Sequence, residues 1–229
     1  SSVRAACDSV VTITGRIRPA MLEFMDAVSI NAVEDKLRMG LDRSAAAMMV
    51  AASDERGGAG AADAEYMAEV FAEYGATEVF STSDPAEGEA FVVARRYAIP
   101  AVEAKGALLL EDVGVPLPAL ADLVAGIEAL AAHRDLVISV IAHAGDGNTH
   151  PLIVFDPADS DQTQRAHLAF GEVMELAINL GGTITGEHGV GRLKKGYLAA
   201  QVGEDVMELT RTIKQALDPQ GLLNPGVML

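Results

Sequence analysis

Residues 136–155 read LVISVIAHAGDGNTHPLIVF, two apolar runs joined by a segment that contains two glycines. The runs Leu136–Ala142 and His150–Phe155 have the length and apolar content of buried strands. Glycine permits positive φ, so the intervening Gly145–Asn148 favours a tight turn. The sequence therefore predicts an antiparallel hairpin that carries one histidine on each side of its turn.

The chain on either side of this hairpin alternates between helical and extended patterns. Helices are expected over residues 2–14, 19–26, 31–40, 63–74, from 84 to a kink at Pro100, and over 118–133, 159–180 and 205–217. Further strands are expected over residues 45–53, 77–82 and 108–115. This order predicts an α+β fold in one domain, with helices on one face of a largely antiparallel sheet and a helical tail.

Composition limits the partners of the chain. Its 229 residues carry a formal charge of −16, which excludes nucleic acid as an expected partner because phosphate backbones need a basic surface. A small anionic substrate would need a local cation for the same reason. Aromatic residues make up only 4 % of the chain and tryptophan is absent, so the core must be aliphatic.

The expected location is cytoplasmic, with peripheral attachment to a membrane left open. The single Cys7 excludes an internal disulfide and fits a reducing compartment. No apolar run reaches the roughly 18 residues of a membrane-spanning helix, and the N-terminal residues lack the apolar stretch of a signal peptide. Because the sequence opens directly on a helix, we expect it to be a segment of a longer protein.

The two histidines of the hairpin are candidate metal ligands. A tight turn would bring His143 and His150 within a few ångströms of each other. Glu187 could complete a His₂Glu set with an open coordination position, which suits zinc, manganese, iron or cobalt. The alternative is that both histidines only satisfy hydrogen bonds of the turn, while Asp146 caps its own backbone.

A second segment, TITGEHGVG at residues 183–191, places Glu187 beside a third histidine. Histidine side chains can accept a proton near neutral pH, so His188 is a candidate general base. Glycines on both sides, Gly186 and Gly189, would let the backbone approach a flat ligand. The alternative is a glycine-rich loop with a capping glutamate, and the segment lacks the Gly-Lys-Ser/Thr ending of a phosphate loop. The following Lys194–Lys195 is interpreted as a solvated pair.

Arg95 and Arg96 are candidates for binding a carboxylate, because a guanidinium can bind one through two parallel hydrogen bonds. Two adjacent residues of a helix point in different directions, so one of the two is expected to face solvent. The alternative role is a surface salt bridge.

These residues together resemble the C-terminal domain of the FAD-linked oxidases of the vanillyl-alcohol-oxidase superfamily. Within it, the chain is most similar to the group of glycolate oxidase catalytic subunits, D-lactate dehydrogenases and D-2-hydroxyglutarate dehydrogenases. The resemblance rests on HAGDGNTHPLI at residues 143–153, GTITGEHGVG at 182–191 and DPQGLLNPG at 218–226. Weaker similarities are PAMLEFMD at 19–26 and EDVGVP at 111–116.

The resemblance implies that residues 1–229 form the cap over a flavin, with a ferredoxin-like sheet and a tail, residues 199–229, that returns to an FAD-binding domain outside this chain. It implies that a divalent metal, with zinc among the candidates, binds to His143, His150 and Glu187, and that His188 is the general base. Arg95 would hold the substrate carboxylate, and Asn224 and Gly189 would lie near the FAD.

The same resemblance implies a small 2-hydroxy acid as substrate. The 2-hydroxyglutarate branch has a threonine and a lysine where Ile99 and Leu110 stand here, which favours a short monocarboxylate such as D-lactate or glycolate. Without its FAD-binding domain the chain is expected to be inactive. The electron acceptor is not identified, and a homo-oligomer remains an option.

Two other functions remain open from the sequence. The same ligands could activate water in a metal-dependent hydrolase that needs no flavin. The chain could also be a non-catalytic metal-binding or assembly module.

Overall fold

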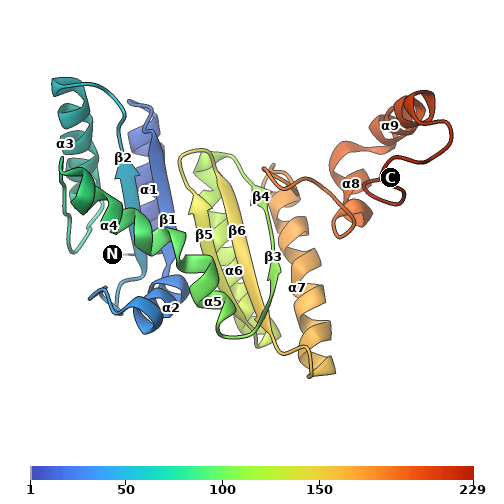
Figure 1. The fold of residues 1–229 in the computed structure, drawn as a ribbon, viewed down its shortest axis with the longest axis horizontal. Coiled ribbons are helices and arrows are strands. Elements are labelled where there is room, and N and C mark those ends of the chain that lie inside the picture. Colours follow the sequence, from blue (N-terminus) through green and yellow to red (C-terminus); the bar gives the residue numbers. More distant parts are fainter. Residues whose placement is uncertain (1) are drawn as a thin grey trace.

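A six-stranded antiparallel sheet forms the centre of the computed structural model, which describes residues 2–229 (Figure 1). Its strands lie in the order β2-β1-β5-β6-β3, and β4 also pairs with β6. Along the chain the elements are α1 (Val3–Thr14), β1 (Met21–Asp26), α2 (Ala27–Leu37), β2 (Ala47–Ala52), α3 (Gly58–Glu73), α4 (Pro85–Arg96), α5 (Ala98–Glu103), β3 (Ala107–Leu110), β4 (Val113–Gly114), α6 (Leu120–Arg134), β5 (Val137–His143), β6 (Asn148–Phe155), α7 (Ser160–Asn179), α8 (Lys195–Val202) and α9 (Glu204–Leu217).

The predicted hairpin of β5 and β6 is confirmed. His143 pairs with Asn148 and Ile141 pairs with His150 in the antiparallel register. Gly147 has φ +80°, and an added Cβ there would overlap the Val115 carbonyl, so this turn position requires glycine. Because directly opposed residues of a sheet point to the same side, both histidines project from one face.

The prediction of a helical turn over Pro19–Asp26 is wrong, because these residues contain a strand. Strand β1 lies between β2 and β5, with Glu23 opposite His143. Leu22 and Phe24 are buried on the face opposite Glu23, which is the alternation of a strand. A short apolar run does not distinguish the two structures by periodicity alone, and pairing on both edges decides this one.

The strand predicted over Thr77–Thr82 is also wrong. These residues form a loop, and Val79 and Phe80 are exposed. Within residues 2–229 no neighbouring strand pairs with this segment, so its β-branched composition has no ladder to join. The helix α8 was not predicted from the sequence.

Helices pack on the sheet in two groups, each around its own apolar cluster. The larger cluster joins one face of β1, β5 and β6 to the helices α1, α3, α6 and α7. The smaller cluster joins part of the other face to α2, α4 and α5 through residues such as Met25, Ile141 and Leu152. The α+β class and the antiparallel sheet are as predicted, but helices cover part of the second face as well.

The C-terminal elements α8 and α9 extend away from the sheet beyond the end of α7 (Figure 1). Helix α9 has one side of exposed apolar residues, namely Val206, Leu209, Ile213 and Leu217. None of the helices within residues 2–229 has the length and apolarity needed to span a membrane.

Candidate active site

His143 and His150 come together on the less covered face of the sheet, at the end next to the β5–β6 turn. Their ring centroids lie 5.2 Å apart at an interplanar angle of 88°. His150 has a side chain that is only 4 % exposed, whereas that of His143 is 37 % exposed. Neither ring bonds to the turn itself, so the alternative in which they only satisfy turn hydrogen bonds is not what the structure has. Asp146 does cap the turn, as its carboxylate accepts from the Asn148 N–H at 3.0 Å.

The segment after α7 brings Glu187 and His188 over these two rings. Glu187 Oε1 lies 3.6 Å from His143 Nε2, 3.3 Å from His150 Nε2 and 3.6 Å from His188 Nε2. The His188 ring stacks on His150, with centroids 5.0 Å apart and planes inclined by 15°. One carboxylate oxygen is thus surrounded by three imidazole nitrogens.

The arrangement of donor atoms is suitable for a metal ion. One ligand atom from each of His143, His150 and Glu187 lies within 4.8 Å of the other two. Two imidazole nitrogens and one carboxylate oxygen form a common divalent-metal donor set. Ligand atoms of Asp112, His150 and His188 also lie within 4.8 Å of one another. The Asp112 carboxylate, however, already accepts several hydrogen bonds from the loop, which makes it less available to a metal.

The two imidazoles are oriented through their Nδ1 atoms. His143 Nδ1–H donates to Glu23 Oε1 at 2.8 Å, and His150 Nδ1 lies 3.3 Å from the Glu111 carbonyl. Both Nε2 atoms are therefore directed at Glu187, as the ligating nitrogens of a metal site would be. The hydrogen bond to Glu23 raises the pKa of His143, whereas burial and the nearby His143 lower the pKa of His150.

Arg95, on α4, reaches the same face of the sheet. Its Nε lies 2.8 Å from Glu23 Oε2, in an ion pair whose two side chains are only 13 % and 12 % exposed. Within residues 2–229 the Arg95 guanidinium forms no other ion pair, so its terminal N–H groups remain available to a ligand. Arg96 instead faces solvent and pairs with Glu89 at 2.7 Å, as expected for one of two adjacent arginines.

The loop that carries Glu187 and His188 is held by one buried carboxylate. Asp112 accepts from the backbone N–H groups of Gly186, Glu187 and His188 and from the Thr185 hydroxyl. Burial alone would raise the pKa of Asp112, but these donors together lower it to about 2.

The interpretation of Lys194 as a solvated side chain is wrong. Lys194 is 5 % exposed, and its Nζ donates to the carbonyls of Asp112 and Ile184 at 2.6 and 2.8 Å. It also lies 3.6 Å from the carboxylate of Glu111, whose pKa burial raises to about 7. The residues around Lys194 in the sequence do not indicate that it is buried. Lys195 is exposed, as predicted.

Gly186 lies close to the β5–β6 hairpin. An added Cβ would overlap the side-chain amide of Asn148, which lies opposite His143 in the hairpin. The missing side chain at Gly186 therefore lets the loop approach the sheet.

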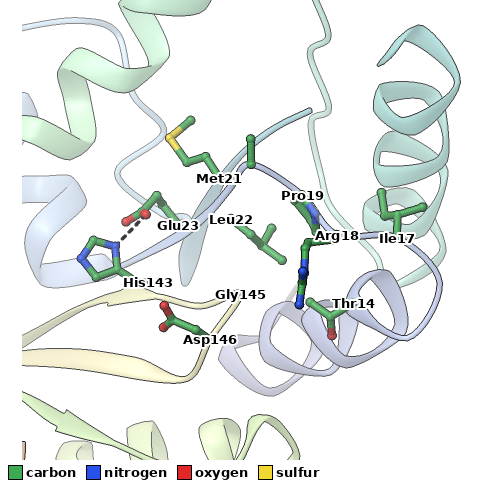
Figure 2. A pocket seen from close by; sticks show the side chains of 11 residues that line it. Thr14, Ile17, Arg18, Pro19, Met21, Leu22, Glu23, His143, Gly145 and Asp146 are labelled. Carbon is green, nitrogen blue, oxygen red and sulfur yellow. Dashed lines mark hydrogen bonds and ion pairs between the residues drawn. The ribbon is translucent and has the colours of Figure 1, made fainter. Parts of the chain in front are cut away.

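A cleft of about 530 Å³ opens beside His143 (Figure 2). Its walls are the end of α1 with the residues that follow it, the start of β1, and the β5–β6 turn. Figure 2 shows Glu23 and His143 joined by their hydrogen bond among the residues that line the cleft. The two site residues thus border a space open to a small molecule.

The two residues expected near the flavin lie outside this cluster. Gly189 is exposed, with φ +80° and open space around its Cβ position. Asn224 belongs to the tail, where its carbonyl accepts from the Val227 N–H at 3.1 Å. The tail returns to the glycine-rich loop, because the Met228 N–H donates to the Gly191 carbonyl at 2.9 Å.

Comparison with known proteins identifies the family. The model of the family described as FAD linked oxidases, C-terminal domain, matches residues 1–228. The chain belongs to this family. It is 37 % identical over 229 residues to the glycolate oxidase subunit GlcD of Bacillus subtilis (strain 168), covering 99 % of this chain and 49 % of that protein. It is also 37 % identical over 215 residues to GlcD of Escherichia coli (strain K12), covering 93 % and 43 %.

A shorter match, 39 % identical over 121 residues, is to the mitochondrial D-lactate dehydrogenase [cytochrome] of Arabidopsis thaliana, covering 53 % of this chain and 21 % of that protein. Among solved structures, p-cresol methylhydroxylase with substrate bound is similar in fold, with a TM-score of 0.68 at 13 % identity over 97 % of this chain and 50 % of that one. The chain therefore shares the fold of this solved structure. It spans about half the length of the two GlcD proteins that it matches along nearly all of its own length.

Three residues of the site were not identified from the sequence. Glu23 lay within a segment predicted to be helical, although its place between Leu22 and Phe24 is the signal of a strand. Asp112 and Lys194 were missed because each bonds to residues more than 70 positions away in the sequence. No local pattern identifies such contacts.

Proposed function

We propose that this chain is the substrate-side domain of a flavin-dependent 2-hydroxy acid dehydrogenase or oxidase of the D-lactate or glycolate type. The observation that carries the proposal is the convergence of His143 Nε2, His150 Nε2 and Glu187 Oε1 within 4.8 Å, beside the partly buried cation of Arg95. Membership in the FAD linked oxidases supports the reaction class. A carboxylate-binding cation next to a metal-type donor set fits an α-hydroxy acid, which offers a carboxylate and a hydroxyl.

Each residue has a distinct role in this proposal. Arg95 binds the substrate carboxylate through its free N–H groups and so orients the α-carbon. His188 accepts the hydroxyl proton, since its side chain is 40 % exposed and so within reach of a substrate, whereas that of His150 is 4 % exposed. His143, His150 and Glu187 would hold a divalent metal, zinc being one candidate, and such an ion acts as a Lewis acid that lowers the pKa of a hydroxyl. FAD supplies the hydride acceptor.

Two apolar side chains, Ile99 and Leu110, favour a short substrate. Leu110 lies opposite Leu152, on the face of the sheet that also carries His150, and Ile99 packs in the smaller apolar cluster. Neither side chain can bind a second carboxylate. The protein is therefore proposed to prefer D-lactate or glycolate over a dicarboxylate such as D-2-hydroxyglutarate.

The tail, residues 199–229, is proposed to pack against an FAD-binding domain that precedes this chain. The relatives are about twice as long as the chain, and the exposed apolar side of α9 offers a surface for such a domain. Gly189 and Asn224, joined through the contact between loop and tail, are proposed to lie near the FAD in the assembled protein.

The direct test restores the upstream half of the protein and adds D-lactate, glycolate or D-2-hydroxyglutarate without oxygen. The assembled protein is expected to be yellow and to bleach with one of the two monocarboxylates. The isolated domain is expected to be inactive, and turnover of a 2-hydroxy acid without flavin would refute this. A restored protein that binds no flavin would contradict the whole proposal and leave a metal-dependent hydrolase or a non-catalytic assembly module.

Variants with matched controls test the residue roles. His188→Ala is expected to abolish flavin reduction while the metal stays bound, and His167→Ala, on the exposed side of α7, should change neither. Arg95→Gln is expected to raise KM for the substrate, whereas Arg96→Gln should not, because Arg96 faces solvent. Loss of metal from His188→Ala in elemental analysis would reverse the assignment of base and ligands.

A further inference from the structure

Glu23 contacts two functional side chains at once. Its Oε1 accepts from His143 Nδ1 at 2.8 Å, and its Oε2 lies 2.8 Å from Arg95 Nε. Its side chain is 12 % exposed, so both contacts lie in surroundings where charge is weakly screened. One carboxylate therefore joins a candidate metal ligand to the candidate carboxylate anchor.

The backbone makes this bridge rigid. Glu23 is opposite His143 in the antiparallel pairing of β1 with β5, and β1 is held on its other side by β2. Pairing on both edges fixes the backbone of Glu23, so its side chain starts from a constant position relative to His143. Arg95 stands on α4, which packs on the sheet through the smaller apolar cluster, and the ion pair with Glu23 links its guanidinium directly to the strand beside His143.

The contacts also determine what the two partners can do. The Glu23 carboxylate holds the Nδ1 proton of His143, which leaves Nε2 as the ligating atom. The same carboxylate is the counter-ion beside Arg95 Nε, and the terminal N–H groups of the guanidinium are left to bind a ligand. Without Glu23, a partly buried guanidinium would have no counter-ion and the imidazole could turn.

We propose that Glu23 is a positioning residue that sets His143 and Arg95 at a fixed separation, so that one substrate can meet both the metal and the guanidinium. This inference rests on the proposed function, since it needs a metal at His143 and a carboxylate at Arg95. It predicts that one substitution at Glu23 weakens metal binding and substrate binding together, although Glu23 touches neither.

The test uses the full-length protein with FAD bound. Zn²⁺ affinity is measured by competition with a chromogenic chelator, and KM and kcat are measured with D-lactate or glycolate at saturating Zn²⁺. Glu23→Gln removes the negative charge and leaves one acceptor oxygen for two donors, so it is expected to weaken Zn²⁺ binding by about 10- to 100-fold, the usual effect of disturbing the hydrogen-bond partner of a ligand. KM is expected to rise by about tenfold or more, because misplaced binding groups lose orientation, with a smaller change in kcat.

Two further variants control for a merely structural effect. Glu172→Gln removes a partly exposed ion pair with Arg134 far from the site, and it should leave Zn²⁺ affinity and KM unchanged. Glu23→Asp keeps the charge beside Arg95, so it should fold even if Glu23→Gln does not. Its shorter side chain cannot span both partners, so it is still expected to lose Zn²⁺ affinity, or raise KM, by about tenfold.

Each outcome separates this inference from the function on which it rests. Wild-type Zn²⁺ affinity and KM in a folded Glu23→Gln or Glu23→Asp protein would overturn the inference and leave the proposed function intact. A wild-type protein that binds no Zn²⁺ at all would overturn the metal site, and this inference with it. A fall in melting temperature with unchanged Zn²⁺ affinity and KM would show a structural role only, and would also overturn it.

Discussion

His143 and His150 stand on neighbouring strands, whereas Glu187 and His188, which face them, stand on a loop. The strand residues are aligned by a ladder of backbone hydrogen bonds shared by many residues. The loop residues are 53 % and 40 % exposed, and their backbone is held mainly through the single carboxylate of Asp112. The two histidines on strands are therefore held by many backbone hydrogen bonds, whereas the two residues on the loop depend on very few side chains.

The largest effect is expected from Asp112→Ala, which removes the acceptor of four hydrogen bonds to the loop. A hydrogen bond to a charged group contributes about 1.5–3 kcal/mol, so losing four should cost about 6 kcal/mol or more and make local opening of the loop at least about 10,000-fold more frequent. Amide hydrogen exchange at residues 186–188 should accelerate, while the amides of β5 and β6 should not change. Asp146→Ala, at an exposed turn carboxylate, is the control. Unchanged exchange at residues 186–188 would contradict the proposed dependence on Asp112.

Lys194→Met is expected to have the next largest effect. It leaves the buried Glu111 carboxylate without its cation and two carbonyls without their donor. Breaking a buried ion pair costs about 3–5 kcal/mol, which should appear in the free energy of unfolding by urea. Lys194→Met with Glu111→Gln should recover part of this loss, and the exposed Lys195→Met should change little. Equal effects of the Lys194 and Lys195 variants would show that burial does not distinguish them.

Gly186→Ala is expected to affect the loop alone. The added methyl group would overlap the Asn148 side chain, and overpacking of this kind costs about 1–3 kcal/mol. The loop should shift from the sheet, so Zn²⁺ affinity should fall while strand amides keep their protection. Removing the obstacle in the double variant with Asn148→Ala should restore affinity. No gain from that second change would mean that the clash is absent.

The smallest effect is expected from Gly189→Ala. The Cβ would enter open space, but φ of +80° is strained for alanine, at about 1 kcal/mol. Stability should fall slightly and Zn²⁺ affinity should be unchanged. In the full-length protein, the FAD affinity is the decisive measurement, because a loss there supports the placement of Gly189 near the cofactor. An effect on Zn²⁺ binding as large as that of Gly186→Ala would remove the distinction between the two glycines.

The parts of the fold that were predicted correctly are those with strong local patterns. The hairpin of β5 and β6 has two long apolar runs and a glycine turn, and α6 and α7 repeat apolar residues over three or more turns. Strand β1 was not predicted because its alternation of inward and outward side chains covers only a few residues. Such a short pattern fits a turn of helix equally well. The strand predicted over Thr77–Thr82 is wrong because high β-propensity does not by itself provide a neighbouring strand for pairing.

The candidate site divides in the same way. His143, His150, Glu187 and His188 were indicated by rare residue types in two compact segments, and the structure brings all four together. Glu23 could not be identified in this way, because its importance lies in contacts with residues on other elements. The burial of Lys194 likewise depends on the segment that contains Glu111, which no local composition indicates.

The pairing of Glu23 with His143 has a consequence for the synthesis of the chain. The two residues are 120 positions apart, so a ribosome must release nearly two-thirds of this domain before their contact can form. Until then the inner edge of β1 lacks its β5 neighbour, and an unpaired strand edge can join another chain. Closing so long a loop costs entropy before any contact compensates it, which slows folding. Newly made protein should therefore aggregate more readily at high expression than its mature stability would suggest.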